Sequence, residues 1–283
     1  MKYVGCQSMV DEIKYLLVKR PQVSHQNQAN MDEQWRKLFY PGPQHYETVL
    51  REYEEFLHLL ARFEMEISYL PADATTGLDS IYTHDPLVIA NSGVILCNMG
   101  KAAAGEPKAA AHYLEQVGVP ILGEITGDGR LEGGDVCWLD ERIVAVGEGY
   151  RTNAEGIRQL RTLLGDAVDE VIPVPLPHWT GPDDCLHLLS FISPVDHDLA
   201  VVYSRMMPAP FRQLLLARGC AWWKCRMKSM RRWPVMCWPW RRANVSCWPA
   251  TPSRNSGWKQ PAPPSGPTKG AISVLKGVVA RLV

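Results

Sequence analysis

The sequence predicts an α/β fold. Within its 283 residues, short apolar runs with strand-like patterns alternate with segments whose apolar residues recur at helical spacing. A unit of hairpin, helix and strand recurs at least three times, and repetition of one supersecondary unit is typical of radially arranged folds. The length suits one large domain or two small ones. Periodicity by itself supports α/β and no finer class.

The first part of the chain starts with a strand and contains one long helix. The strand is predicted at residues 10–21, around the apolar run Tyr15-Leu16-Leu17-Val18. Residues 22–44 are polar and irregular, which predicts a lid-like or variable loop. A helix is predicted at residues 45–65, because five apolar residues recur on one helix face: Val49, Tyr53, Phe56, Leu57 and Leu60. A short strand is predicted at residues 69–71.

The recurring unit fills the chain from residue 87 onward. Its first copy is a hairpin with arms at residues 87–90 and 94–97 around Asn91-Ser92-Gly93, followed by a helix at 108–117 and a strand at 119–125. The second copy is predicted as a hairpin with arms at 136–139 and 143–147 and Asp140-Glu141 at its turn, a helix at 153–164 with Asn153 as N-cap, and a strand at 168–176. The third copy is predicted as a hairpin with arms at 187–192 and 199–203, followed by a helix at 211–218.

The charge pattern changes abruptly at residue 220. The formal net charge is zero, yet residues 220–283 hold 12 of the 30 Lys and Arg and none of the 30 Asp and Glu. Seven of the ten Trp also lie there. We therefore divide the chain into residues 1–219, an acidic α/β domain, and residues 220–283, an aberrant tail rich in Trp, Arg and Pro.

The cysteines before residue 220 are scattered, with no CxxC pair and no zinc spacing: Cys6, Cys97, Cys137 and Cys185. Together with the lack of a signal peptide, this predicts a reducing, cytoplasmic setting. No apolar run reaches the length of a membrane span. We interpret Cys6 as a small buried thiol rather than a nucleophile.

One stretch has the residue types for chemistry, Leu-Glu-Gly-Gly-Asp-Val at residues 131–136. Paired glycines beside a strand let the backbone approach a ligand closely. Glu132 and Asp135 could grip a cationic planar group through charge-assisted hydrogen bonds. The competing interpretation is a glycine-rich turn with solvated acids.

Three further segments complete a pattern found in a known family. Asp79 and Asp85 have Asp-x5-Asp spacing, Arg-Thr-Asn-x-Glu-Gly begins at Arg151, and Leu-His-Leu is centred on His187. With residues 131–136, this order resembles the guanidine-modifying enzymes, namely dimethylarginine dimethylaminohydrolase, arginine deiminase and the amidinotransferases. The resemblance runs from about residue 5 to about residue 219. It implies a five-bladed α/β propeller (pentein), with the last blade missing or disordered in this chain.

The resemblance also implies a chemistry. In the family a Cys thiolate attacks the guanidinium carbon, the amine leaves, and water resolves the covalent intermediate to citrulline. By the resemblance, Glu132 orients and deprotonates the reacting groups, and His187 acts first as general acid and then as general base. Asp79 and Asp85 grip the guanidinium, and Arg151 binds the substrate α-carboxylate. No metal and no cofactor is expected.

Several of these roles have structural alternatives. Asp135 either binds substrate or braces the Gly-Gly turn. His187 stands in an apolar run, where a histidine can simply be part of the core. Asp85 precedes a proline and could be a turn former, and Arg151 could be a surface cation.

Two departures from the family pattern bear on substrate and activity. Met99-Gly100 is followed by Lys-Ala-Ala-Ala where many members have an Arg-rich stretch, which puts the second carboxylate clamp in doubt. Arginine deiminases place an Asp two residues after the His, whereas Leu188-Leu189 follows His187 here. This favours a dimethylargininase-like or other hydrolase over an arginine deiminase.

The family nucleophile has no counterpart in the tail, where a Cys in a Gly-Gly-Pro-Thr-Cys context is expected. A one-base slip of the reading frame near residues 219–222 accounts for this. In the shifted frame, each codon consists of the last base of one printed codon and the first two bases of the next. The boundary between Trp222 and Trp223 then encodes Val, and the codons of residues 269–283 can encode KGGDISLKGGGGPTC. The alternative is a basic aromatic arm for membrane or nucleic acid. We interpret the tail as frameshifted.

Three consequences follow for the chain as given. We expect residues from about Cys220 onward to lack regular structure, because their prolines remove ladder donors and break helices. The sheet edges beside them would stay open. Without the nucleophile, no citrulline would be formed.

The leading hypothesis is a dimethylargininase-like hydrolase of guanidino C–N bonds that converts arginine or a methylated arginine to citrulline. One alternative is an amidinotransferase, which passes the amidino group to an amine. The other is a non-catalytic propeller binding protein, which would need no pair of Glu132 and His187. The expected partner is a small guanidino molecule, with no nucleic acid and no membrane. A homodimer is left open.

Overall fold

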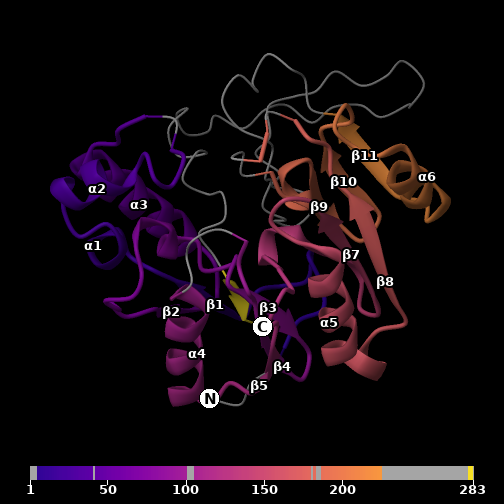
Figure 1. Cartoon of the computed structure of the whole chain (residues 1–283), viewed down its shortest axis with the longest axis horizontal. Helices are drawn as coiled ribbons and strands as arrows, with labels where there is room; N and C mark the ends of the chain where they lie inside the picture. The colour runs from indigo at the N-terminus through magenta and orange to yellow at the C-terminus, as the bar shows by residue number, and fades with distance from the viewer. Residues whose placement is uncertain are drawn as a thin grey trace.

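In the computed structural model, the described residues are 5–40, 42–100, 105–179, 181–182, 186–224 and 280–282. Their strands form four three-stranded sheets, with α1 to α4 to one side of the molecule in Figure 1 and α5 and α6 to the other. Within the first sheet the strands lie in the order β12 (Ala280–Leu282), β1 (Tyr15–Val18) and β2 (Glu66–Tyr69), and within the second in the order β3 (Leu87–Ala90), β4 (Gly93–Leu96) and β5 (Ile121–Glu124). The third sheet has the order β6 (Val136–Asp140), β7 (Ile143–Glu148) and β8 (Glu170–Pro175), and the fourth has the order β9 (Ile192–Asp196), β10 (Leu199–Val202) and β11 (Ala221–Lys224).

All four sheets follow one pattern. The central strand pairs antiparallel with one neighbour and parallel with the other. Helical chain always leads from the central strand to its parallel neighbour, which is the crossover that parallel pairing requires. These connections are α1 (Pro21–Ser24), α2 (Gln28–Gln34) and α3 (Tyr46–Leu60) in the first sheet, then α4 (Glu106–Gln116), α5 (Ala154–Leu164) and α6 (Ala209–Ala217). The predicted α/β class and its repeating unit are therefore confirmed.

The helices begin where local signals predict. The Asn153 side chain accepts a hydrogen bond from the Gly156 amide at 2.9 Å, so it caps α5 as expected. Pro107 lies in the first turn of α4, where its missing N–H costs nothing. The predicted face of α3 is buried, including Tyr53 and Phe56. No helix among the described residues is long and apolar enough to cross a bilayer.

The predicted loop at residues 22–44 is wrong in part, because it contains α1 and α2. Pro21 starts α1. Asn27 caps α2 by accepting a hydrogen bond from the Asn30 amide at 2.9 Å. These caps allow short helices in a polar segment that has no apolar periodicity. The flanking strands are also displaced, since β1 covers only Tyr15–Val18 and β2 ends at Tyr69, where the short strand was predicted to begin.

The strand predicted at residues 187–192 is mostly a turn of 3₁₀ helix at Leu188–Ser190, and β9 begins at Ile192. The Ser190 hydroxyl accepts from the His187 amide at 3.0 Å, and the Ser190 amide donates to the His187 carbonyl at 3.0 Å. These local bonds use the backbone groups that a strand would offer to a neighbour. As a result, His187 stands at a corner and not within a sheet.

Two segments of the tail contradict the expectation of no regular structure. β11 pairs parallel with β10, and β12 pairs antiparallel with β1, as the yellow arrow in Figure 1 shows. Neither segment contains proline, so each can supply ladder donors whatever its side chains are. Both strands cover sheet edges that were expected to stay open. Residues 225–279, to which most of the prediction applied, lie outside the described part.

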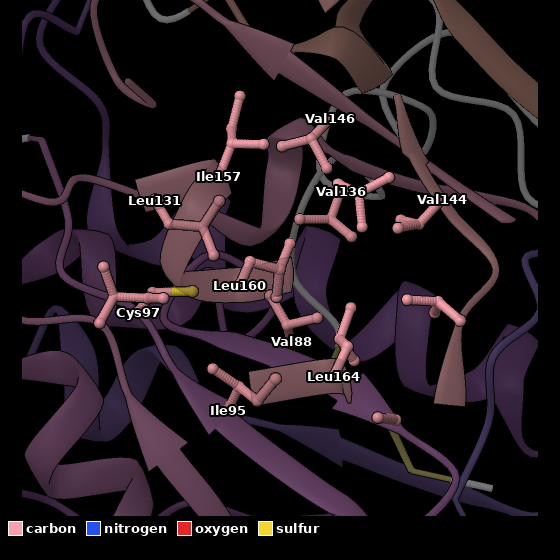
Figure 2. Close-up of a cluster of buried hydrophobic side chains, with 14 of the residues drawn as sticks. Val88, Ile95, Cys97, Leu131, Val136, Val144, Val146, Ile157, Leu160 and Leu164 are labelled. Atoms are coloured by element: carbon pink, nitrogen blue, oxygen red, sulfur yellow. The ribbon is translucent and has the colours of Figure 1, made fainter. Parts of the chain in front are cut away.

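Among the described residues, the largest apolar cluster lies between the β3–β4–β5 and β6–β7–β8 sheets and α5 (Figure 2). It contains Leu131 and Val136, which are 0% and 4% exposed and flank the Glu-Gly-Gly-Asp sequence. Both ends of that sequence are therefore held in the core. Such anchoring fixes the four intervening residues in a well-packed interior.

Candidate active site

Gly133 and Gly134 are required by close packing. A methyl group built on Gly134 would lie 2.7 Å from Cδ2 of His187 and 3.0 Å from Oδ1 of Asp85. One built on Gly133 would collide with the backbone carbonyl of His84. The Gly133 amide donates to the Asp85 carbonyl at 2.8 Å. The absence of two side chains thus lets three distant segments meet.

Glu132 is fully buried and its two oxygens are surrounded by donors. Oε1 accepts from the Gly100 amide at 2.9 Å and from Nε of Arg151 at 2.9 Å. Oε2 accepts from Nη2 of Arg151 at 2.7 Å, and Nε2 of His187 lies 3.4 Å away. This fork-like pairing of guanidinium and carboxylate is the arrangement that a guanidino ligand would also make.

Asp135 fixes His187 from the opposite side. Its Oδ2 accepts from the Thr152 hydroxyl at 2.6 Å, and its Oδ1 accepts from the Leu188 amide at 2.9 Å. Nδ1 of His187 lies 3.3 Å from Oδ2 of Asp135. The imidazole is therefore held between the carboxylates of Glu132 and Asp135.

Asp85 completes the cluster. It offers a carboxylate oxygen that lies, with ligand atoms of Glu132 and His187, in a group within 4.8 Å of one another. Burial raises the pKa of Asp85 to about 6, an effect that the positive charge of His187 opposes and the negative charge of Glu132 reinforces. Three such side chains can also hold a metal ion. The guanidinium of Arg151 already lies against Glu132, so the arrangement suits a planar organic cation better.

Asp79 lies at the edge of this cluster. It is 6% exposed, and its negative charge helps to raise the pKa of Asp85. Burial, followed by the neighbouring Tyr82 and Asp79, raises the pKa of the hydroxyl of Tyr40, which comes from the segment after α2. The segment expected to be lid-like therefore reaches one of the predicted substrate-binding residues.

The structure brings together the residues that the sequence singled out. Glu132, Asp135, Arg151 and His187 form a chain of direct contacts, and Asp85 joins them. Asp79 is near enough for its charge to raise the pKa of Asp85. The glycine turn is not flanked by solvated acids, since Glu132 and Asp135 are both 0% exposed. Arg151 is only 9% exposed, so it is not a surface cation.

Sequence reasoning missed two contributors, Gly100 and Thr152. They bind the carboxylates of Glu132 and Asp135 through a backbone amide and a hydroxyl, which carry no distinctive sequence signal, although Thr152 follows directly after Arg151.

Two cysteines bear on the question of the nucleophile. Cys97 lies near the cluster, and burial followed by the charges of Glu132 and Asp85 raises its pKa well above the usual value. Such a thiol is not activated, because the thiolate is the nucleophilic form. Cys6 is 7% exposed and donates to the Ser8 carbonyl at 3.3 Å, which confirms the prediction of a buried thiol. Of the tail cysteines, Cys220 is partly exposed and burial raises the pKa of its thiol, while the remaining three lie outside the described residues.

Comparison with known proteins gives a consistent picture. Residues 78–219, about half of the chain, match the family model described as arginine deiminase. The chain is 26% identical over 124 residues to the N(G),N(G)-dimethylarginine dimethylaminohydrolase of Pseudomonas aeruginosa. The matched region covers 44% of this chain and 48% of that protein. It spans about half the length of the curated relatives it matches first.

Solved structures show the same fold. A mutant of the Pseudomonas aeruginosa enzyme complexed with citrulline superposes with a TM-score of 0.58 at 21% identity, covering 72% of this chain and 74% of the other. An amidinotransferase from Microseira wollei superposes with a TM-score of 0.52 at 13% identity, covering 74% and 73%. Residues 78–219 contain every predicted site residue, from Asp79 to His187.

Proposed function

Because the chain belongs to the arginine deiminase family, we propose that its gene encodes a dimethylargininase-like hydrolase of guanidino C–N bonds. The observation that carries the proposal is the buried row of Glu132, His187 and Asp135 beside the carboxylate of Asp85. The substrate is arginine or a methylated arginine, and the product is citrulline. The five-bladed arrangement of the family and a cytoplasmic setting are part of this proposal.

Substrate binding requires an exchange of guanidinium groups. Asp85 and Asp79 attract the cationic end of the substrate, whose guanidinium then replaces that of Arg151 on Glu132. Arg151, released from its 2.7 Å contact with Oε2 of Glu132, turns to the substrate α-carboxylate. The exchange keeps the buried carboxylate paired throughout, which avoids the cost of an isolated buried charge.

His187 is the proton donor and acceptor in the proposed reaction. A thiolate attacks the guanidinium carbon, and the C–N bond to the leaving amine breaks as His187 protonates that amine. Neutral His187 then takes a proton from water, whose oxygen attacks the same carbon and releases the thiolate and citrulline. Glu132 and Asp135, 3.4 and 3.3 Å from its two nitrogens, hold the ring and stabilise its charged form.

The thiolate belongs to a cysteine that the tail would carry in its original reading frame. We propose that residues 220–283 are the product of a frame slip and that the chain as given has lost the nucleophile. Resequencing the codons for Arg218 to Trp223 tests this directly. An intact gene that encodes the tail as given would refute the slip.

The activity is tested on frame-corrected protein. Incubation with arginine and, separately, with dimethylarginine should release citrulline from at least one of them, whereas the chain as given should release none from either. Substitution of the restored cysteine by serine is the matched control. Amidino transfer to glycine without citrulline would favour the amidinotransferase alternative, to which the likeness in fold also extends.

A non-catalytic binding protein is the remaining alternative. Asp85→Ala should abolish binding of arginine if the cluster is a substrate site, because it removes a partly buried carboxylate beside Glu132. Unchanged binding would favour a scaffold. Size-exclusion chromatography with light scattering would test the homodimer that the sequence leaves open.

A further inference from the structure

A second cavity lies apart from the candidate active site, between the end of β1, the segment after β2 and α4. Its volume is about 60 Å³, and the residues that line it include none of the candidate active-site residues named above. One water molecule needs about 10–15 Å³ of such space. The cavity can therefore take a small organic molecule of about five non-hydrogen atoms.

Lys19 brings a buried cation to the wall of this cavity. It follows β1 directly, is 2% exposed, and its Nζ donates to the Thr76 hydroxyl at 3.0 Å. A lysine ammonium has three N–H donors, yet within the described part of the chain Nζ makes no second hydrogen bond and no ion pair. Because buried donors in native proteins almost always have a partner, an acceptor is expected in the cavity.

Two acids line the same cavity. Glu106, the first residue of α4, is 5% exposed, and Asp73 belongs to the segment after β2. Burial lowers the pKa of Lys19, an effect that the negative charges of Glu106 and then Asp73 oppose. A simple anion in the cavity would meet these acids, and a simple cation would meet Lys19. A molecule that carries both charges can place each end against the opposite charge of the wall.

The rest of the wall limits the ligand to a small one. The Thr83 hydroxyl already donates to the Leu17 carbonyl at 2.9 Å, so it needs no further acceptor. Three buried apolar residues narrow the space, namely Leu70, Pro86 and Ala110. A ligand with a long side chain would have to displace them, which a well-packed interior resists.

We propose that this cavity is a binding site for a small zwitterionic amino acid of the size of glycine. The ligand carboxylate accepts hydrogen bonds from Nζ of Lys19, and the ligand ammonium donates to the carboxylate of Glu106. The site is independent of the proposed function, since the two share no residue. Thr83 and Pro86 line it from the segment that carries Asp79 and Asp85, so a bound ligand packs against the back of that segment.

The first test follows the amides of the ¹⁵N-labelled full chain by NMR during titration. Glycine should shift the amides of Thr76 and Thr83, with a dissociation constant in the millimolar range, because so small a ligand makes few contacts. Acetate and methylammonium each carry one of the two charges and should bind at least about tenfold more weakly. Leucine should shift neither amide. Equal binding of acetate and glycine, or spectra that glycine leaves unchanged, would overturn the proposal.

Two variants assign the charges. Lys19→Met keeps the side-chain stem but removes the ammonium, and Glu106→Gln keeps the shape but removes the charge. Each should weaken glycine binding by at least about tenfold. Lys14→Met is the matched control, since Nζ of Lys14 pairs with Glu12 at 2.6 Å on the surface, and it should bind glycine as the parent does. Unweakened binding in both variants would refute the site, and if either fails to fold, the series of ligands on the parent chain decides.

Discussion

At the scale of single residues, the site depends on the absence of side chains as much as on their presence. Gly134 leaves the space into which His187 and Asp85 converge, and Gly133 leaves space for the backbone at His84. The acids and the histidine come from three segments far apart in sequence. They can converge only because the turn between them consists of two glycines, which have no side chains.

Gly134→Ala tests this dependence. Its methyl group would lie 2.7 Å from Cδ2 of His187. Overpacking of this kind costs about 1–3 kcal/mol of unfolding free energy. We expect that loss by urea denaturation, together with the loss of arginine binding. Gly42→Ala is the control, since a methyl group there meets nothing within 4 Å, and it should change neither property.

Asp85 should make ligand binding depend on pH. Its pKa is raised to about 6, so the carboxyl is neutral below that pH and charged above it. Arginine binding, measured by calorimetry from pH 5 to 8, should weaken by up to about tenfold per unit below pH 6 and level off above it. Asp85→Asn should bind weakly at every pH. A parent profile that is flat between pH 5 and 8 would contradict the assignment.

The raised pKa of Asp85 affects folding stability in the opposite direction to ligand binding: stability falls as the pH rises, whereas binding strengthens. A folded-state pKa above the unfolded value of 3.8 contributes stability at low pH, which is lost as the pH rises through about 6. At pH 8 the ionised carboxylate is therefore destabilising until a cation binds. Asp85→Asn should raise the unfolding free energy at pH 8 and change it less at pH 5. Such a loss of stability in the ligand-free protein is a common feature of functional sites.

At the scale of secondary-structure elements, local hydrogen bonds decide where segments begin. Asn153 caps α5 through the Gly156 amide, and its side-chain oxygen also accepts from the Arg130 amide at 3.0 Å. Its side-chain NH₂ donates to the Asp128 carbonyl at 2.8 Å. One side chain thus ties the start of α5 to the loop that leads into the Glu-Gly-Gly-Asp sequence.

Asn153→Ala should lower the unfolding free energy by about 1–2 kcal/mol, because the cap and its ties are lost together. Urea denaturation followed by circular dichroism measures the change. Gln116→Ala at the exposed end of α4 is the comparison and should stay within about 0.5 kcal/mol of the parent. Equal effects of the two substitutions would show that the cap is not important.

The elements that could be predicted are those with signals in neighbouring residues. The hairpin turn after Ala90, the cap at Asn153 and the face of α3 are of this kind. The turn at Leu188–Ser190 was missed because an apolar run looks like a strand. Its shape depends on the Ser190 hydroxyl, which accepts from the His187 amide, and on Asp135, which accepts from the Leu188 amide. The pairing of Arg151 with Glu132 was missed because it arises from tertiary packing and has no local pattern.

At the scale of the whole molecule, the site is supported by the largest core. Leu160 of α5 is 0% exposed in the cluster that also holds Leu131 and Val136 (Figure 2). Leu160→Ala should cost about 2–5 kcal/mol of unfolding free energy through lost burial and a cavity. Leu216→Ala, at a side chain 46% exposed, should cost far less. Thermal and urea denaturation would compare the two.

The strand β12 closes the edge of β1, with Leu16 opposite Arg281. Arg281→Pro should break this ladder, because proline lacks the N–H donor. Hydrogen exchange of the β1 amides should then speed up while that of β3 stays the same. Arg281→Ala keeps the donor and should leave both unchanged. Slow exchange in the proline variant would mean that β12 does not protect that edge.

The pairing of β12 with β1 has a consequence during synthesis. β1 leaves the ribosome early, but its antiparallel partner is made roughly 265 residues later, since β1 starts at Tyr15 and β12 at Ala280. At about 5–20 residues per second, the nascent chain waits on the order of 10–50 s with that backbone edge uncovered. Unpaired strand edges recruit other chains. Recovery of this protein in cells should therefore depend on translation speed and on chaperones that bind the emerging N-terminal segment.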